Sequence, residues 1–473
     1  MAALLSKEKR IIYIRRIRQF WEEYRAKKIG LIGLGLLIGY ILVAVFAPWL
    51  SPYDPIASPR LAQSFAMPEW VTIFPQYRDL TTTQEIPISW EAKEGSQYVS
   101  GWGKSVTVKY KPETLGSIKV ELNGGFSYAK APPNEFFVQF RYDAKQVRDV
   151  EYSLTLTILT PEERKYLFFN SPTSVVPQGE GVTMDSKDPL FIARVGFTAI
   201  ENVAAKVFSQ KGEYTFSLVI QFRPLSINAA AEIDIEKGRT VILGHVHGIL
   251  GADYLAQDIF SQLVHGARLS LIIGLLAAVV GTGIGMLVGI ISGYLGGVVD
   301  EVSMRTVDVL LCLPLLPLLL ALVNLYGRNV YYIVLFIAIF GWQGLARVIR
   351  SQTLSIRETA YIETARASGA SGFYIMLRHI LPNIIPVAFA SMVLAVPSAI
   401  LFESALSFLG FGDPRVPTWG KMLQHAFGFG GFDNLAWWWI IPPGLAIIGI
   451  CLGFVFVGFA FDEIVNPRLR RRR

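Results

Sequence analysis

The feature that most constrains this chain is a set of long apolar runs without charged side chains. The first extends from Ile29 to Leu50. A helix of about 20 apolar residues is long enough to cross a hydrocarbon core about 30 Å thick. Similar runs predict further helices over about 268–293, 306–327, 329–347, 384–409 and 437–460. The sequence therefore predicts an α-helical transmembrane bundle of six spans.

Composition supports a membrane protein and excludes several kinds of site. Only 17% of the 473 residues are charged, against about 25% in a typical soluble domain. The two cysteines, Cys312 and Cys451, lie in apolar runs, which argues against a disulfide framework or a cysteine metal site. The sequence contains no GxxxxGK[ST] motif. We therefore expect no ATP site, no metal and no bound cofactor on this chain.

The first apolar run has an alternative interpretation as a cleaved signal peptide, because Val45-Phe46-Ala47 resembles a cleavage site. Three features argue against cleavage. The polar segment 1–28 is long for such a peptide, the apolar run exceeds the usual 7–15 residues, and Pro48 would follow the cut. We therefore predict a cytoplasmic basic N-terminus over 1–28 and an uncleaved transmembrane helix over 29–50.

Residues 51–245 are different in kind, because apolar and polar residues alternate there. Such alternation predicts half-buried strands. The clearest runs are 105–110, 118–122, 136–142, 152–159, 190–198, 214–222 and 231–235. Asn123-Gly124 predicts a hairpin turn. We expect a large extracytoplasmic β-rich, sandwich-like domain inserted between spans one and two, followed by a pre-helix segment over 246–267. The β-rich domain is either a folded spacer or a docking surface for another protein.

Glycines recur in the second predicted span. Gly281, Gly285 and Gly289 are spaced four residues apart. Small residues at this spacing let helix backbones approach closely in a membrane. The pattern predicts close helix packing, and glycines facing lipid are the alternative.

Basic residues predict the orientation, because cytoplasmic segments of membrane proteins are enriched in Lys and Arg. The segments 1–28, 348–383 and 461–473 are all basic. Six spans over 29–50 and 268–460 place all three on the cytoplasmic side, whereas five or seven would not. We therefore expect a multi-pass protein of the cell (inner or plasma) membrane with both termini cytoplasmic.

The cytoplasmic loop 348–383 contains two predicted helices separated by glycine. Leu354 to Ser368 suits a first helix, and Gly369 can end it because glycine adopts positive φ freely. Ser371-Gly372 can begin a second helix through Leu381, and Pro382 then marks the start of the next span. The loop should form a protruding knob that fits a cleft on a partner.

This loop resembles the EAA motif of permease subunits of binding-protein-dependent ABC importers. In that motif, three residues, a glycine, nine residues and I-x-L-P follow EAA. The matching residues are Glu363, Thr364, Ala365, Gly369, His379, Leu381 and Pro382. Thr364 replaces an alanine and His379 replaces the isoleucine, and RHILPN is similar to the dipeptide/oligopeptide/nickel branch.

Further segments resemble the same branch, although residues 60–240 do not. They are 258–261, 266–271, 304–308, 341–351, 403–412 and 417–420. The resemblance implies a permease that forms half of a pathway for peptides or related small solutes and is not itself an enzyme. It also implies several partners. These are a second homologous permease, two ATP-binding subunits that use the ATP, and an extracytoplasmic solute-binding protein. The ATPase-coupling residues would be those of the loop.

Other candidate residues and functions stay open. Glu403 lies in or near the fifth span, where it either gates the pathway or makes a structural contact. Asp300, Glu301, Arg305 and Asp308 are expected at a cytoplasmic turn as an ion-pair cluster. The alternative functions are an ion-coupled secondary transporter and a membrane-anchored extracytoplasmic binding module. The substrate could be a peptide, an oligosaccharide or nickel.

Overall fold

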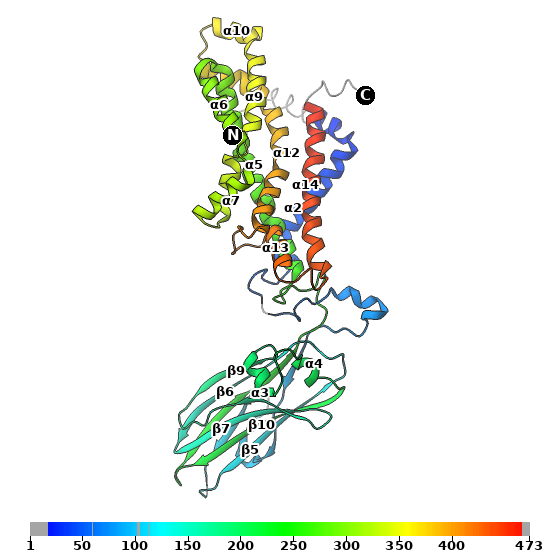
Figure 1. Cartoon of the computed structure of the whole chain (residues 1–473), viewed down its shortest axis with the longest axis vertical. Helices are drawn as coiled ribbons and strands as arrows, with labels where there is room; N and C mark the ends of the chain where they lie inside the picture. The colour runs from blue at the N-terminus through cyan, green and yellow to red at the C-terminus, as the bar shows by residue number, and fades with distance from the viewer. Residues whose placement is uncertain (1–17, 59, 102–104, 113, 466–473) are drawn as a thin grey trace. The chain divides into compact units, whose positions relative to one another are not determined.

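The chain folds into a helical unit and a β-rich unit. A computed structural model describes residues 18–58, 60–101, 105–112 and 114–465. The helical unit comprises 1–58 and 259–473, and the β-rich unit comprises 59–258 (Figure 1). The inserted unit thus begins and ends somewhat later in the sequence than the predicted domain 51–245, and it takes in most of the expected pre-helix segment.

Among the residues that the structure describes, the helical unit contains five helices, or continuous helical stretches, that are long and apolar enough to cross a membrane. They are Lys28–Leu50, Ile259–Leu295, Val330–Arg357, Gly372–Phe408 and Trp437–Ile464. The elements of this unit are α2 (Lys28–Leu50), α5 (Ile259–Leu295), α6 (Gly297–Cys312), α7 (Leu315–Tyr326), α8 (Val330–Ile339), α9 (Gln343–Arg357), α10 (Ala360–Ala367), α11 (Gly372–Ile375), α12 (Leu381–Phe408), α13 (Trp419–Gly428) and α14 (Trp437–Val465). These stretches correspond to five of the six predicted spans.

The remaining predicted span, 306–327, is not one continuous helix. It is divided between α6 and α7, whose axes differ by 87°. Pro314 lies at the break, where its ring and missing N–H disfavour continuation of the helix. The bent pair is either a broken span or a re-entrant segment, so the described residues contain five candidate spans, or six if the bent pair counts as one.

The predicted close packing of glycines in the second span is confirmed. An added Cβ at Gly285 would lie 2.8 Å from the Trp342 carbonyl oxygen, and one at Gly289 would lie 2.7 Å from the Ala346 carbonyl oxygen. Gly293 faces Thr353 in the same way, at 2.8 Å. These three glycines bring the backbone of α5 against α9.

The β-rich unit consists of two antiparallel sheets. Its strands are β1 (Gln84–Ile88), β2 (Glu91–Glu94), β3 (Val99–Ser100), β4 (Ser105–Tyr110), β5 (Ile118–Tyr128), β6 (Phe136–Arg148), β7 (Val150–Leu159), β8 (Lys165–Asn170), β9 (Gly179–Asp185), β10 (Gly212–Pro224), β11 (Ala230–Glu236) and β12 (Gly238–Ile242). One sheet has the order β1-β12-β6-β11-β4-β3 with β9 beside β6, and the other has the order β2-β5-β10-β7-β8. In both sheets, alternate side chains are buried, and those of the two sheets pack together in one apolar cluster, as expected for a sandwich.

Two of the strand predictions are wrong. Residues 190–198 were expected as a strand, but Pro189–Val195 form helix α3, with Asp188 as its N-cap and Gly196 at φ +90° as its end. Asn123-Gly124 is not a turn, because both residues lie inside β5. A Cβ on Gly124 would approach Ile88 Cγ2 to 2.4 Å, so this glycine provides room for a neighbouring side chain.

Candidate coupling loop and membrane cavity

The predicted loop forms a small helical knob between α9 and α12. The first expected helix, 354–368, is interrupted, because α9 ends at Arg357 and α10 begins at Ala360. Gly369 follows the end of α10 and has φ +82°, a conformation that glycine adopts without strain. Ser371 then caps α11 by accepting a hydrogen bond from the Tyr374 N–H at 3.3 Å.

A cluster of isoleucines holds the knob against the ends of the spans. Ile362 of α10, Ile375 of α11 and Ile380 are completely buried. They belong to the same apolar cluster as Ile290 of α5 and Ile349 of α9. The knob is therefore packed onto the helices that enter the membrane, so that a displacement of the knob would be transmitted to them.

The predicted coupling residues fall on this knob, with different exposures. Glu363 and Thr364 of α10 are exposed, whereas Ala365 is partly buried against the isoleucine cluster. The Thr364 hydroxyl donates to the Ala360 carbonyl at 2.9 Å, so the threonine fits within the helix at a position where the family motif has alanine. Gly369 is exposed, and a Cβ added there would have no described atom within 4 Å.

The second half of the motif continues directly into the span. Residues Met376–Ile380, which include His379, form a π-helical turn, and Leu381 and Pro382 begin α12 without a break. Pro382 marks the start of this span, as expected. Pro382 lies in the first turn of α12 after the wider π turn, where a missing N–H costs little.

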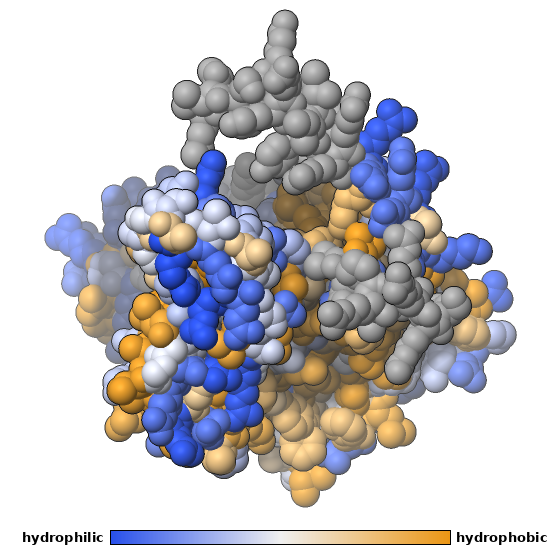
Figure 2. Space-filling model, turned by 90° about the horizontal axis from the view of Figure 1, so that it is seen from above, coloured by the Kyte–Doolittle hydropathy of each residue, from blue (hydrophilic) through white to orange (hydrophobic). Residues whose placement is uncertain are grey.

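The outer surface of the knob combines aromatic and charged groups. Phe373 is 68% exposed, and Tyr361, Tyr374 and Leu377 are about half exposed. Figure 2 looks onto the end of the helical unit that carries α10 and shows hydrophilic residues gathered on part of that surface, with hydrophobic residues beside them. Exposed aromatic side chains on a polar surface are typical of sites that bind another protein.

Ion pairs that the sequence did not assign connect α9 to α6. Arg350 donates two hydrogen bonds to the Asp300 carboxylate, both at 2.5 Å. Arg347 pairs with Asp308. Asp300 and Asp308 were expected within a cluster at a turn, but they lie on helix α6 and pair with α9 instead. Spacing in the sequence could not reveal partners so far apart along the chain.

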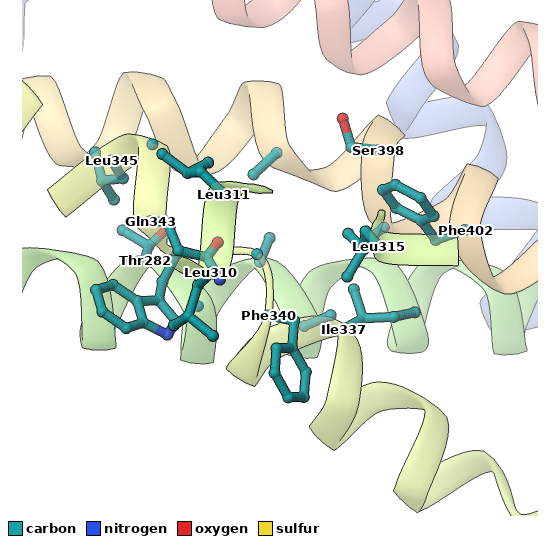
Figure 3. A pocket seen from close by; sticks show the side chains of 18 of the residues that line it. Thr282, Leu310, Leu311, Leu315, Ile337, Phe340, Gln343, Leu345, Ser398 and Phe402 are labelled. Atoms are coloured by element: carbon teal, nitrogen blue, oxygen red, sulfur yellow. The ribbon is translucent and has the colours of Figure 1, made fainter. Parts of the chain in front are cut away.

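A cavity of about 330 Å³ lies among the membrane helices. It is bordered by α5 and α12, with the ends of α6 and α7 and the start of α9 completing its wall (Figure 3). Its polar side chains are Thr282, Gln343, Ser391 and Ser398, and the described residues contribute no charged side chain to the lining. The helix break at Leu313 also borders the cavity. The cavity is therefore lined by apolar groups and a few neutral polar side chains.

Glu403 lies apart from this lining. It is 2% exposed and accepts a hydrogen bond from Ser407 at 2.6 Å. Gly412 and Gly420 let the following segment fold against this part of α12, because a Cβ on either would clash with Ser407 or Ser404. The gating role of Glu403 stays a prediction, and its observed contacts are those of a structural group.

The segment after α12 is held by a second carboxylate. Asp413 accepts a hydrogen bond from the Val330 N–H, at the start of α8, at 3.2 Å. The guanidinium of Arg415 donates to both Asp413 oxygens and lowers the pKa of this carboxyl. Asp413 therefore remains charged and fixes α8 to the end of α12.

A multi-span helical unit with a packed external knob and an internal cavity defines the class of membrane transport proteins. Residues 285–471 match the family model described as binding-protein-dependent transport system inner membrane component. Residues 16–68 match the N-terminal TM domain of oligopeptide transport permease C. The unmatched residues between these ranges contain most of the β-rich unit.

Three curated relatives support the same assignment. The dipeptide transport system permease protein DppC of Bacillus subtilis is 35% identical over 47% of this chain and 69% of its own length. The oligopeptide transport system permease protein OppC of Haemophilus influenzae is 34% identical over 46% and 70%. The glutathione transport system permease protein GsiD of Pectobacterium atrosepticum is 36% identical over 47% and 73%. The chain belongs to the family of permease subunits of peptide ABC importers, as its loop indicated.

Proposed function

We propose that this chain forms half of the translocation pathway of an ABC importer and receives the motion of an ATPase subunit through its knob. The proposal rests on the two faces of the knob. Its exposed face holds Glu363 and Phe373, and its buried face joins α5, α9 and α12 through one apolar cluster. A contact that differs between two states of the ATPase would shift these helices together.

The cavity is the proposed half of the pathway. A second homologous permease would complete it, and an extracytoplasmic binding protein would deliver the solute. The neutral lining favours this function over an ion-coupled secondary transporter, which typically uses charged groups within the membrane. The names of the relatives favour a dipeptide, an oligopeptide or glutathione as the kind of substrate.

The proposed orientation puts the knob and both termini in the cytoplasm and the β-rich unit outside. The basic residues around the knob support it. In this scheme the partner subunits bind and hydrolyse ATP, and this chain has a mechanical role only. A thiol introduced at Ser368 should be shielded from an impermeant maleimide in intact cells, whereas one at Ile227 should react.

The coupling proposal can be tested in the assembled transporter with Gly369→Pro and Gly369→Asn. Proline cannot adopt φ +82°, whereas asparagine tolerates this region. We expect Gly369→Pro to reduce uptake and substrate-stimulated ATPase activity about tenfold, equivalent to about 1.4 kcal/mol. Gly369→Asn should retain most of both activities.

A charge reversal provides an independent version of the test. Glu363→Arg places a positive charge on the exposed face of the knob, and Glu213→Arg makes the same change at an exposed position of β10 in the β-rich unit. Only Glu363→Arg should lower substrate-stimulated ATPase activity in complexes that still assemble. If uptake and ATPase activity are unchanged in both Glu363→Arg and Gly369→Pro, the knob does not couple the two subunits.

A further inference from the structure

The β-rich unit joins the rest of the chain through two segments that pair with each other. The Leu61 N–H donates to the Ala256 carbonyl at 3.1 Å, and the Met67 N–H donates to the His245 carbonyl at 2.9 Å. We call the paired segments 61–69 and 244–256 the neck. Span α5 begins at Ile259, directly after the last residue of the unit, Asp258. Only residues 257 and 258 therefore separate the neck from the start of α5.

An exposed apolar patch, which we call the neck patch, is formed by Ile249 of the neck and by Trp70, Ile73 and Phe74, which directly follow the neck's first segment. The exposed fractions are 40% for Trp70, 80% for Ile73, 51% for Phe74 and 58% for Ile249. Trp70 and Ile73 lie on one side of the 3₁₀ helix η2 (Glu69–Ile73), because residues three apart eclipse in such a helix. An aromatic and aliphatic patch of this kind in a membrane-tethered segment is typical of interfacial contact.

Hydrogen bonds hold the neck patch in a defined shape. The Trp70 indole N–H donates to the Ile249 carbonyl at 3.0 Å. The Gly248 N–H donates to the Glu69 carboxylate at 2.9 Å. These contacts join η2 to the turn at Gly248, so the apolar groups are presented on a fixed scaffold.

A polar hollow of about 270 Å³ begins on the same 3₁₀ helix, since Glu69 and Thr72 line it. Its other lining residues include Arg78, Thr81, Thr82 and Lys130. Neither Arg78 nor Lys130 forms an ion pair with another residue that the structure describes. The carboxylate of Glu69 is already engaged with a backbone N–H. Two cations and several hydroxyls next to an apolar patch suit a phosphate group attached to acyl chains.

We propose that the neck patch and this hollow bind an anionic phospholipid of the membrane surface. Trp70, Ile73 and Phe74 contact the boundary between headgroups and acyl chains, and Arg78 and Lys130 contact the phosphate. This contact would fix the inserted unit on the bilayer from which it emerges. This attachment of the β-rich unit to the bilayer does not depend on the coupling proposed for the knob.

The proposal can be tested with the full chain in phosphatidylcholine vesicles, with or without phosphatidylglycerol, whose acyl chains carry bromine. A bimane label is attached at Gln76→Cys, an exposed position beside the neck patch, after Cys312 and Cys451 are replaced by Ser. The reference label is at Ile227→Cys. Strand β6 separates the two sites, because its Phe136 pairs with Ile242 near the neck and its Arg148 pairs with Ala230 near Ile227. We expect bromine quenching at Gln76 to exceed that at Ile227 at least about threefold.

Variants identify the groups responsible. Ile73→Asp should abolish the excess quenching, whereas Ile200→Asp, at another exposed isoleucine of the unit, should leave it unchanged. Arg78→Glu with Lys130→Glu should remove the additional quenching that phosphatidylglycerol produces. Equal quenching at Gln76 and Ile227 would overturn the proposal. Quenching that is insensitive to phosphatidylglycerol would overturn the assignment of the hollow to an anionic headgroup.

Discussion

Gly289 and Gly283 lie on the same helix and have opposite surroundings. A Cβ at Gly289 would lie 2.7 Å from both the Ala346 carbonyl oxygen and Ile349 Cβ. At Gly283 no described atom comes within 4 Å. The spacing of glycines indicates that a helix can pack closely, and only the position of α9 determines which of them do so.

We therefore predict that Gly289→Leu destabilises the helical unit and Gly283→Leu does not. Overpacking at a close backbone contact costs about 1–3 kcal/mol. Thermal unfolding of the purified chain in detergent, followed by circular dichroism, should show a lower Tm for Gly289→Leu alone. Equal melting temperatures for the two variants would mean that α5 and α9 are not in close contact.

Helix α9 connects the two candidate functional features of the chain. Its first residues, Gln343 to Leu345, line the cavity, and its last residue, Arg357, precedes the knob. The pairs Arg350–Asp300 and Arg347–Asp308 join it to α6, whose end also borders the cavity at Leu310. Figure 1 shows α6 and α9 together at the end that carries α10. A movement of the knob would therefore displace the residues of α9 and of α6 that line the cavity.

Charge reversal of one ion pair tests this connection. Asp300→Arg or Arg350→Asp alone should lower substrate-stimulated ATPase activity and uptake about tenfold, because a bidentate pair worth about 1–2 kcal/mol is lost. The double variant should recover a large part of both activities, since the opposite charges meet again.

The matched control for this prediction is Glu301→Arg. Glu301 is the exposed neighbour of Asp300 and forms no ion pair among the residues that the structure describes. This variant should leave both activities nearly unchanged. Failure of the double variant to recover activity, in complexes that assemble normally, would show that the pair does not transmit motion.

At the scale of the whole molecule, the β-rich unit is an insertion with adjacent ends. Its own apolar cluster includes Val120, Val138 and Leu218 from both sheets. The hydrogen bond between Leu61 and Ala256 shows that the chain leaves this unit beside the point where it enters. Such an arrangement allows an insertion to be gained or removed without disturbing the unit that carries it.

We predict that residues 62–255 can be replaced by a short Gly-Ser linker without unfolding the helical unit. The Tm of the shortened chain in detergent should stay within about 5 °C of that of the full chain, because the deletion removes no residue of the helical unit. Removal of 118–224 instead should cause aggregation, since the remaining strands lose their partners. If both deletions unfold the helices, the two units fold together.

Local chemistry explains which elements could be predicted. The bounds of β4 agree with the predicted run 105–110, because strict alternation there reflects one buried face. Helix α3 was missed because its apolar residues also suited a strand, although Asp188, Pro189 and Gly196 are start and stop signals for a helix. The bend at Pro314 was missed because the length of an apolar run does not show whether the helix continues straight.

Hydrophobicity and residues close together in the chain are enough to predict the class of protein, the apolar runs and the motif residues of the knob. The bend between α6 and α7, the pairing of Asp300 with Arg350, and the close packing of Gly289 rather than Gly283 become visible only in the folded structure. These features depend on which elements become neighbours. That choice results from burial and charge pairing over the whole helical unit, and no local pattern in the sequence records it.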